Sequence, residues 1–219
     1  MGFLSSIFKK TKKTKSSSSK QKKRRSTKTD PTEAAATASL LSIGSEHSET
    51  VLAQEDPIPS NASEELRVVR EWIRAKDEHN IEKMQELTGE GCFFTFTDSE
   101  TEMPASEFYG AVNETIQSFP DIHFFWKSMK VQGPSTNKSK AGMVVVVNDY
   151  YGIGKHTGKA YGFGPYPPVE PTGKTVRDEN IEFTFTVSDG KIVDATIYAF
   201  GELVGPPGFY TKIGGVILF

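Results

Sequence analysis

Apolar residues between positions 61 and 120 recur every three or four residues, which is the spacing of an amphipathic helix. Asn61, with Glu64 three residues later, predicts the start of a first helix. A second helix is expected over 81–87 and a third over 104–119, while 92–97 (CFFTFT) has the composition of a strand. The apolar face of the first helix contains Leu66, Val69, Trp72 and Ile73.

The pattern of apolar positions favours strands after residue 120. Strands are expected over 122–131, 142–151, 176–187 and 191–201, and the Asp-Gly pair at 189–190 is a two-residue hairpin signal. Three helices followed by a run of hairpin-linked strands indicate an α+β domain. We expect the three helices to pack on one face of a curved antiparallel sheet.

The last predicted strand has two faces of different character, because successive side chains point to opposite sides of a sheet. We expect the mixed polar and aromatic face to line a ligand pocket and the apolar face to form a homodimer; the opposite assignment stays open. The expected pocket face contains Asp194, Thr196, Tyr198, Phe200 and, just beyond the strand, Glu202. The other face contains Val193, Ala195, Ile197 and Ala199.

Charge is distributed unevenly along the chain. The 219 residues carry a formal net charge of −2, but residues 1–29 contain eleven Lys or Arg and no Asp or Glu, so the remainder carries −13. A segment of this composition cannot bury apolar surface, so we expect 1–60 to be a disordered basic arm and linker. The folded domain is expected over 61–219, which is long enough for one core.

The basic arm has four interpretations that the sequence leaves open. Gly2 fits the loose myristoylation pattern, and an apolar segment before a lysine cluster is typical of a membrane-surface anchor. The alternatives are an organelle transit peptide, a nuclear import signal and a solvated tail. The basic residues that would act are Lys9, Lys10, Lys12, Lys13, Lys22, Lys23, Arg24 and Arg25.

Composition excludes several classes of protein. No apolar run approaches the length of a membrane span, and the lone Cys92 excludes an intramolecular disulfide scaffold or a cysteine-rich zinc site. The spacing of histidines predicts no metal site, and no motif predicts a cofactor. The arm lacks aromatic residues for base stacking and the remainder is acidic, so we expect no specific nucleic-acid binding. We expect an intracellular location, cytoplasmic or membrane-associated, with organelle and nucleus left open.

Residues outside the last strand are further candidates for the site. Asp149 follows four valines and is a candidate general base, and His156, in a glycine-flanked loop, is a candidate hydrogen-bond donor to a ligand. Trp126 is a candidate pocket wall. Tyr161 and Phe163, among glycines and prolines, are typical of a lid over an apolar ligand or of a plain loop.

Four short motifs, in this order and at this spacing after the helices, resemble one known family. They are 119–121 (FPD), 156–158 (HTG), 171–174 (PTGK) and 189–192 (DGKI). Over residues 63–215 the chain resembles the SnoaL-like polyketide (ester) cyclases of the nuclear-transport-factor-2-like superfamily. The resemblance implies a curved sheet wrapped around a helix, a conical pocket and, often, a dimer formed through the sheet.

The resemblance also implies a chemistry, from which this chain departs at one position. Cyclases of the family use an acidic residue near the end of the last strand as a general base, without metal or cofactor. That position falls on Phe200, and Glu202 is two residues further on. Two hypotheses follow: a non-catalytic module that binds a small apolar, carbonyl-bearing ligand, or a cofactor-free cyclase, isomerase or hydratase with Glu202 or Asp149 as base.

Overall fold

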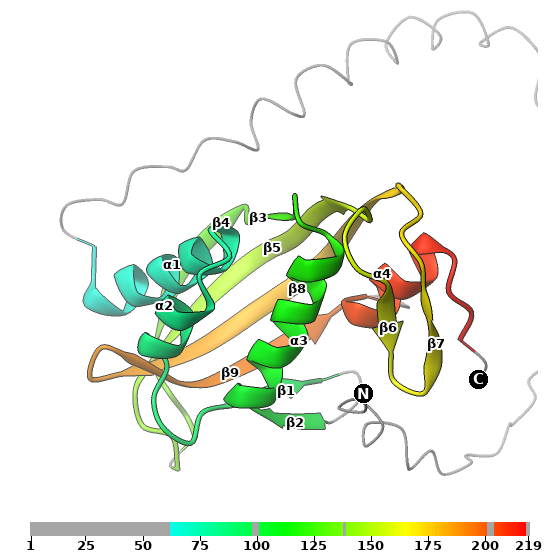
Figure 1. Cartoon of the computed structure of the whole chain (residues 1–219). Coiled ribbons are helices and arrows are strands. Elements are labelled where there is room, and N and C mark those ends of the chain that lie inside the picture. Colours follow the sequence, from blue (N-terminus) through cyan, green and yellow to red (C-terminus); the bar gives the residue numbers. More distant parts are fainter. Residues whose placement is uncertain (1–61, 98–100, 138, 201–203, 218–219) are drawn as a thin grey trace, which may run out of the picture. The chain divides into compact units, whose positions relative to one another are not determined.

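The computed structural model describes residues 62–97, 101–137, 139–200 and 204–217, without the side chains of 179 and 180 (Figure 1). The helices are α1 (Glu64–Asp77), α2 (Ile81–Glu86), α3 (Ala105–Ser118) and α4 (Pro206–Ile213). The first strands are β1 (Phe93–Phe96), β2 (Thr101–Pro104), β3 (His123–Phe125) and β4 (Ser128–Pro134). The later strands are β5 (Met143–Lys155), β6 (Tyr161–Phe163), β7 (Tyr166–Val169), β8 (Thr175–Ser188) and β9 (Lys191–Ala199).

Side-chain caps define where the first two helices begin. The side chain of Ser63 accepts a hydrogen bond from the backbone N–H of Leu66 at 3.3 Å and caps α1. The side chain of Asn80 accepts one from the N–H of Lys83 at 2.9 Å and caps α2. Asn61, the cap predicted from the sequence, lies outside the described residues.

The main sheet has seven strands and is rich in antiparallel pairs. Its order is β2-β1-β9-β8-β5-β3, with β4 also paired to β5, and its one parallel pair among the described strands is β1 with β9. The pairing of β5 with β8 shifts register around Tyr150, where Asp149 has a positive φ of 50°. Such bulges bend a strand and increase its twist. The fold is therefore a mixed α+β fold with a strongly curled sheet.

The core lies between the helices and one face of this sheet. Trp72 of α1 is fully buried, and its ring stacks 5.9 Å from Phe94 of β1 and 6.1 Å from Phe108 of α3. Phe94 and Phe108 stack on each other with ring centres 3.8 Å apart. Stacked rings bury much apolar area, so this cluster fixes α1 and α3 on the sheet.

The faces of β9 are the reverse of those predicted. Ala195 and Ile197 are buried against the core, whereas Thr196 and Tyr198 are only partly covered and Phe200 is 57% exposed. The physical reason is that the helices cover the wholly apolar face, which removes the larger apolar area from water. That face therefore packs inward, so a dimer formed through the outer side of the sheet would use the mixed face of β9.

Three structured segments were not predicted. β2 forms at 101–104, α4 begins at two consecutive prolines, and β6 and β7 form a separate hairpin in the glycine- and proline-rich stretch. Prolines suit a first helical turn and a strand whose N–H groups need no partner, but they are also common in loops. The predicted strand 122–131 is divided into β3 and β4.

None of the described helices combines the length and apolarity needed to cross a membrane.

Candidate functional site

A cavity of about 170 Å³ lies between the helices and the inner face of the sheet. Residues from α1, α3, β1, β2, β3, β5, β6, β8, β9 and the start of α4 line it, so it is built from nearly the whole folded unit. The apolar lining includes Phe96, Met103, Phe108, Val112, Phe124, Phe163, Ile181, Phe183, Ile197 and Phe209. Its polar side chains are those of Lys76, Thr101, Thr115, Tyr150 and Asp178.

Lys76, in the last turn of α1, is the basic residue that lines this cavity. The residue is only 7% exposed, and its Nζ lies 4.2 Å from the ring centre of Phe124 and 5.0 Å from that of Tyr150. The rings of Phe183, Phe108 and Trp72 follow at 5.6, 5.9 and 6.0 Å. Ring faces attract a cation, which partly compensates for the loss of water.

Burial changes the protonation of Lys76. Removal from water disfavours the charged form and lowers the pKa of Lys76 from 10.5 to about 7, and the nearby charge of Asp178 opposes this change. Near neutral pH, a large share of the Lys76 side chains is therefore the uncharged amine.

Asp178 of β8 brings a carboxylate to the same cavity. The residue is 4% exposed, and its two carboxylate oxygens accept the backbone N–H of Gly205 at 3.0 and 3.1 Å. Gly205 is the N-cap residue of α4, with a φ of 71°. Asp178 therefore holds the start of α4 against the cavity and places a negative charge where the helix dipole favours it.

Tyr150 of β5 contributes a hydroxyl group that is buried and, among the described residues, has no hydrogen-bond partner. Its ring stacks on Phe124 at 5.9 Å and meets Phe183 edge-on at 4.8 Å. Burial raises the pKa of Tyr150 well above its usual value, so the hydroxyl remains protonated. Leaving a buried hydroxyl unpaired costs free energy, and such groups in native proteins often serve a ligand or an ordered water.

The predicted site residues are distributed over different parts of the fold. Of those predicted as pocket walls or lid, Phe163 of β6 lines the cavity. Tyr161 is buried beside it, with its hydroxyl 3.5 Å from that of Thr115, and is not part of the lining. Trp126 is half-buried with the guanidinium of Arg70 6.0 Å from its ring centre, away from the cavity lining.

The two described catalytic candidates lie outside the cavity. The side chain of Asp149 is 63% exposed, with a carboxylate oxygen 3.4 Å from Nζ of Lys127 on the surface. His156 is fully buried, but both of its ring nitrogens have partners: Nδ1 accepts the N–H of Thr172 at 3.3 Å and Nε2 faces the carbonyl of Lys159 at 3.2 Å. In this arrangement His156 supports the loop and has no ring nitrogen left for a ligand.

The remaining predicted residues of the last strand face away from the cavity or are not described. Asp194 pairs with the ammonium of Lys140, and neither Thr196 nor Tyr198 is part of the lining. Phe200 is exposed. Glu202 and the whole basic arm, from Gly2 to Arg25, lie outside the described residues. Among described side chains, no group of three His, Cys, Asp or Glu could hold a metal ion.

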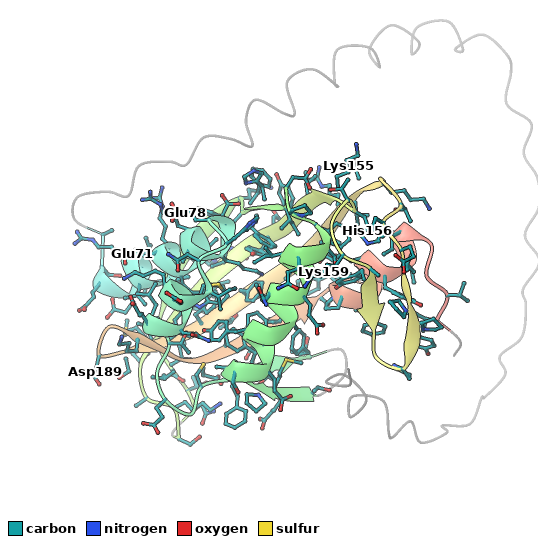
Figure 2. All side chains as sticks on the ribbon, viewed as in Figure 1. Glu71, Glu78, Lys155, His156, Lys159 and Asp189 are labelled. Atoms are coloured by element: carbon teal, nitrogen blue, oxygen red, sulfur yellow. The ribbon has the colours of Figure 1, made fainter. Side chains whose placement is uncertain are left out.

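Three of the motifs that carry the family resemblance meet at one structural junction. The ring of His156 lies 5.1 Å from that of Phe119, and its backbone N–H donates to the carbonyl of Lys174 at 2.9 Å. Gly158 donates its N–H to the carbonyl of Ser118 at 3.0 Å, at the end of α3. Figure 2 shows Lys155, just before this junction, pointing outward from the folded unit. The motifs therefore fasten α3 to the loop after β5 and do not line the cavity.

Lys76, Tyr150 and Asp178 are the cavity residues that sequence reasoning missed. A signal for Lys76 was present, since it follows Ile73 by three residues and Trp72 by four, so it continues the buried face of α1. Glu71 of α1 and Glu78, which directly follows the helix, are by contrast exposed (Figure 2). Asp178 lies two residues after the buried Val176 at the start of β8, so both share one face of the strand.

Comparison with known proteins identifies solved structures of similar fold. TsrD from Streptomyces laurentii is 11% identical, with a TM-score of 0.49 over 74% of this chain and 98% of that chain. A protein described as a SnoaL-like polyketide cyclase, from Jannaschia sp. CCS1, is 17% identical, with a TM-score of 0.44 over 73% and 96%. AusH from Aspergillus nidulans is 12% identical, with a TM-score of 0.46 over 68% and 92%. No protein-family model and no curated protein matches the sequence.

Proposed function

We propose that the folded domain, residues 61–219, binds a small apolar, carbonyl-bearing molecule in the cavity beside Lys76. The observation that supports this function is the lining itself: aromatic and aliphatic side chains from many elements surround a few polar groups. Ligand sites commonly combine an apolar wall with a small number of polar groups that orient the ligand. The amine of Lys76 and the hydroxyl of Tyr150 are both suited to interact with a carbonyl group.

The binding function does not require the acid of the cyclases that the chain resembles. Phe200 occupies the position of that acid and is 57% exposed, so it provides neither a base nor a wall of the cavity. We therefore propose a SnoaL-like domain whose conical pocket binds a ligand. Position 200 carries no carboxylate, so no acid at that position catalyses ring closure.

A second candidate function is cofactor-free catalysis, as a cyclase, isomerase or hydratase, and Asp178 favours it. Asp178 is buried at the cavity wall, where a carboxylate is placed to act as a general base. Glu202 stays a candidate base; Asp149 is weakened as a candidate by its exposure. With an identified substrate, unchanged turnover in Asp178→Asn, Glu202→Gln and Asp149→Asn would remove all three carboxylates from consideration.

The binding function can be tested by filling the cavity. Ala111 of α3 lines the cavity, whereas Asn113 on the same helix is exposed. The full-length protein and its Ala111→Phe and Asn113→Phe variants would be purified from the native cells and examined by native mass spectrometry. We expect the wild type and Asn113→Phe to retain a small molecule and Ala111→Phe to lose it. A ligand retained equally by Ala111→Phe would show that the cavity is not its site. The same spectra report whether the protein is a dimer.

A further inference from the structure

Lys76 is placed where its amine can react with the ligand as well as contact it. It is the cavity residue that continues the buried stripe of α1, so the amine is held by a helix that packs on the core. Five aromatic rings lie within about 6 Å of Nζ. Ring carbons therefore form much of the surroundings of the amine, and burial among them removes it from water.

The uncharged amine that results is a nucleophile. An amine attacks a carbonyl carbon only through its free lone pair, and a lysine in an apolar environment has this lone pair available at a lower pH than a surface lysine. The titratable groups that line the cavity, among the described residues, are Lys76, Tyr150 and Asp178. A hydroxyl donor and a carboxylate acceptor thus share the cavity with the amine.

We propose that Nζ of Lys76 forms a covalent imine with the carbonyl carbon of an apolar aldehyde or ketone in the cavity; this inference rests on the proposed ligand-binding function. The nitrogen lone pair forms the C–N bond while the π electrons of the C=O bond move to oxygen. One proton passes from nitrogen to that oxygen and gives a carbinolamine. The hydroxyl then leaves with the second nitrogen proton as water, and the C=N bond forms, so no oxidant or reductant is consumed.

Asp178 and Tyr150 have defined parts in this step. The carboxylate of Asp178 can accept a proton from the nitrogen and return it to the departing oxygen, as a general acid–base group does. The hydroxyl of Tyr150, which has no partner among the described residues, can donate a hydrogen bond to the carbonyl oxygen. Both residues line the cavity together with Lys76.

Reductive trapping tests the imine directly. The full-length protein would be incubated with hexanal, octanal, cinnamaldehyde or methyl hexyl ketone, with sodium cyanoborohydride, across a pH series. We expect at least one probe to add its own mass less one oxygen atom to Lys76, as located by peptide mapping. The rate of trapping at Lys76 should reach half its maximum near pH 7, and the exposed Lys155 of the same protein serves as the reference.

Because Lys155 of the wild-type protein is the reference for Lys76, the comparison does not depend on whether a variant folds. Lys76→Met should abolish the adduct at that position and Lys155→Met should leave it unchanged. No adduct at Lys76 with any probe, or labelling with the same pH profile as Lys155, would overturn the imine. Ligand-observed NMR with octanol and octanoate, which cannot form an imine, then tests the proposed binding function separately. Octanoate bound by the protein without any aldehyde adduct would make Lys76 an ion-pairing residue and refute its role as a nucleophile.

Discussion

Lys76, which lies among five aromatic rings, makes the stability of the folded unit depend on pH. The folded protein holds the pKa of Lys76 at about 7, while the unfolded chain returns it to its ordinary value near 10.4. Between these values the unfolded state binds more protons, so the free energy of unfolding rises with pH. The penalty for charging Lys76 is fully present below pH 7 and disappears as pH approaches the unfolded value.

Lys76→Met should therefore raise the free energy of unfolding near pH 7, by an amount on the order of a few kcal/mol, because the buried charge is replaced by an apolar side chain of similar length. The difference between variant and wild type should shrink steadily toward about pH 10. Urea denaturation at several pH values measures it. Taking the difference at each pH removes contributions common to both proteins, such as the buried Cys92, whose pKa burial raises to about 12. A pH-independent difference would contradict the assigned titration, and Lys155→Met serves as the surface control.

The unpaired hydroxyl of Tyr150 gives a second prediction at the scale of the residue. Tyr150→Phe should raise the free energy of unfolding of the ligand-free protein by about 1 kcal/mol, because it removes a buried polar group that has no partner. Tyr109→Phe is the matched control. The hydroxyl of Tyr109 accepts a hydrogen bond from Nε1 of Trp72 at 3.3 Å, so its loss should lower the free energy of unfolding by about 1 kcal/mol. Destabilisation by Tyr150→Phe would mean that a water molecule already satisfies the hydroxyl.

At the scale of the element, the loop after β5 and the end of α3 depend on each other. A methyl group on Gly158 would lie 2.0 Å from the carbonyl oxygen of Gln117, a distance that no arrangement of the present backbone allows. The motifs of the family resemblance therefore specify how these two segments pack in this chain and do not contribute to the cavity.

Gly158→Ala should lower the free energy of unfolding by about 2–3 kcal/mol, because the backbone of α3 or of the loop must shift. Gly162→Ala is the control in the same glycine-rich stretch, since its methyl group would meet nothing closer than 3.9 Å. Thermal unfolding followed by circular dichroism compares the two variants. Equal melting temperatures of the two variants would show that the backbone at Gly158 can shift without loss of stability.

The sequence pattern predicted the helices and strands whose apolar residues recur regularly. It did not predict α4, or which face of β9 points to the core. The helices α1 to α3 and the hairpin at Asp189 were expected, because their spacing and turn residues agree. The segment at Pro206 gave no helical signal, since two prolines precede only a short apolar run. The face of β9 could not be decided from the strand alone, because its orientation depends on which side the distant helices cover. For the same reason, the cavity residues Lys76 and Asp178 emerged only from the packing.

At the scale of the whole molecule, charge separates the arm from the folded domain. Residues 1–29 carry +11, while residues 61–219 contain 22 acidic and 15 basic residues. Attachment to an anionic surface would therefore have to use the arm. We propose that the cluster at residues 9–13, next to the apolar segment at residues 3–8, provides it.

Replacing Lys9, Lys10, Lys12 and Lys13 with Gln in the full-length protein should weaken binding to phosphatidylserine-containing vesicles by a hundredfold or more, at about 1 kcal/mol per lysine. Sedimentation with vesicles at low and high salt measures this, and binding of the wild type should fall as salt screens the charges. Phosphatidylcholine vesicles are the control. Equal binding to both lipids, or binding indifferent to salt, would assign the arm to a transit, nuclear or solvated role.

The parallel pairing of β1 with β9 has a consequence for the newborn protein. Thr97, directly after β1, donates a hydrogen bond to the carbonyl of Ile197, one hundred residues later. During synthesis, β1 can pair with β2 early, but its parallel neighbour β9 becomes available only after nearly the entire chain has been made, and such long-range pairing also slows folding. The basic arm emerges well before that moment. A receptor that binds the arm during synthesis would therefore meet a chain whose cavity does not yet exist, and delivery to a location would then precede the ability to hold a ligand.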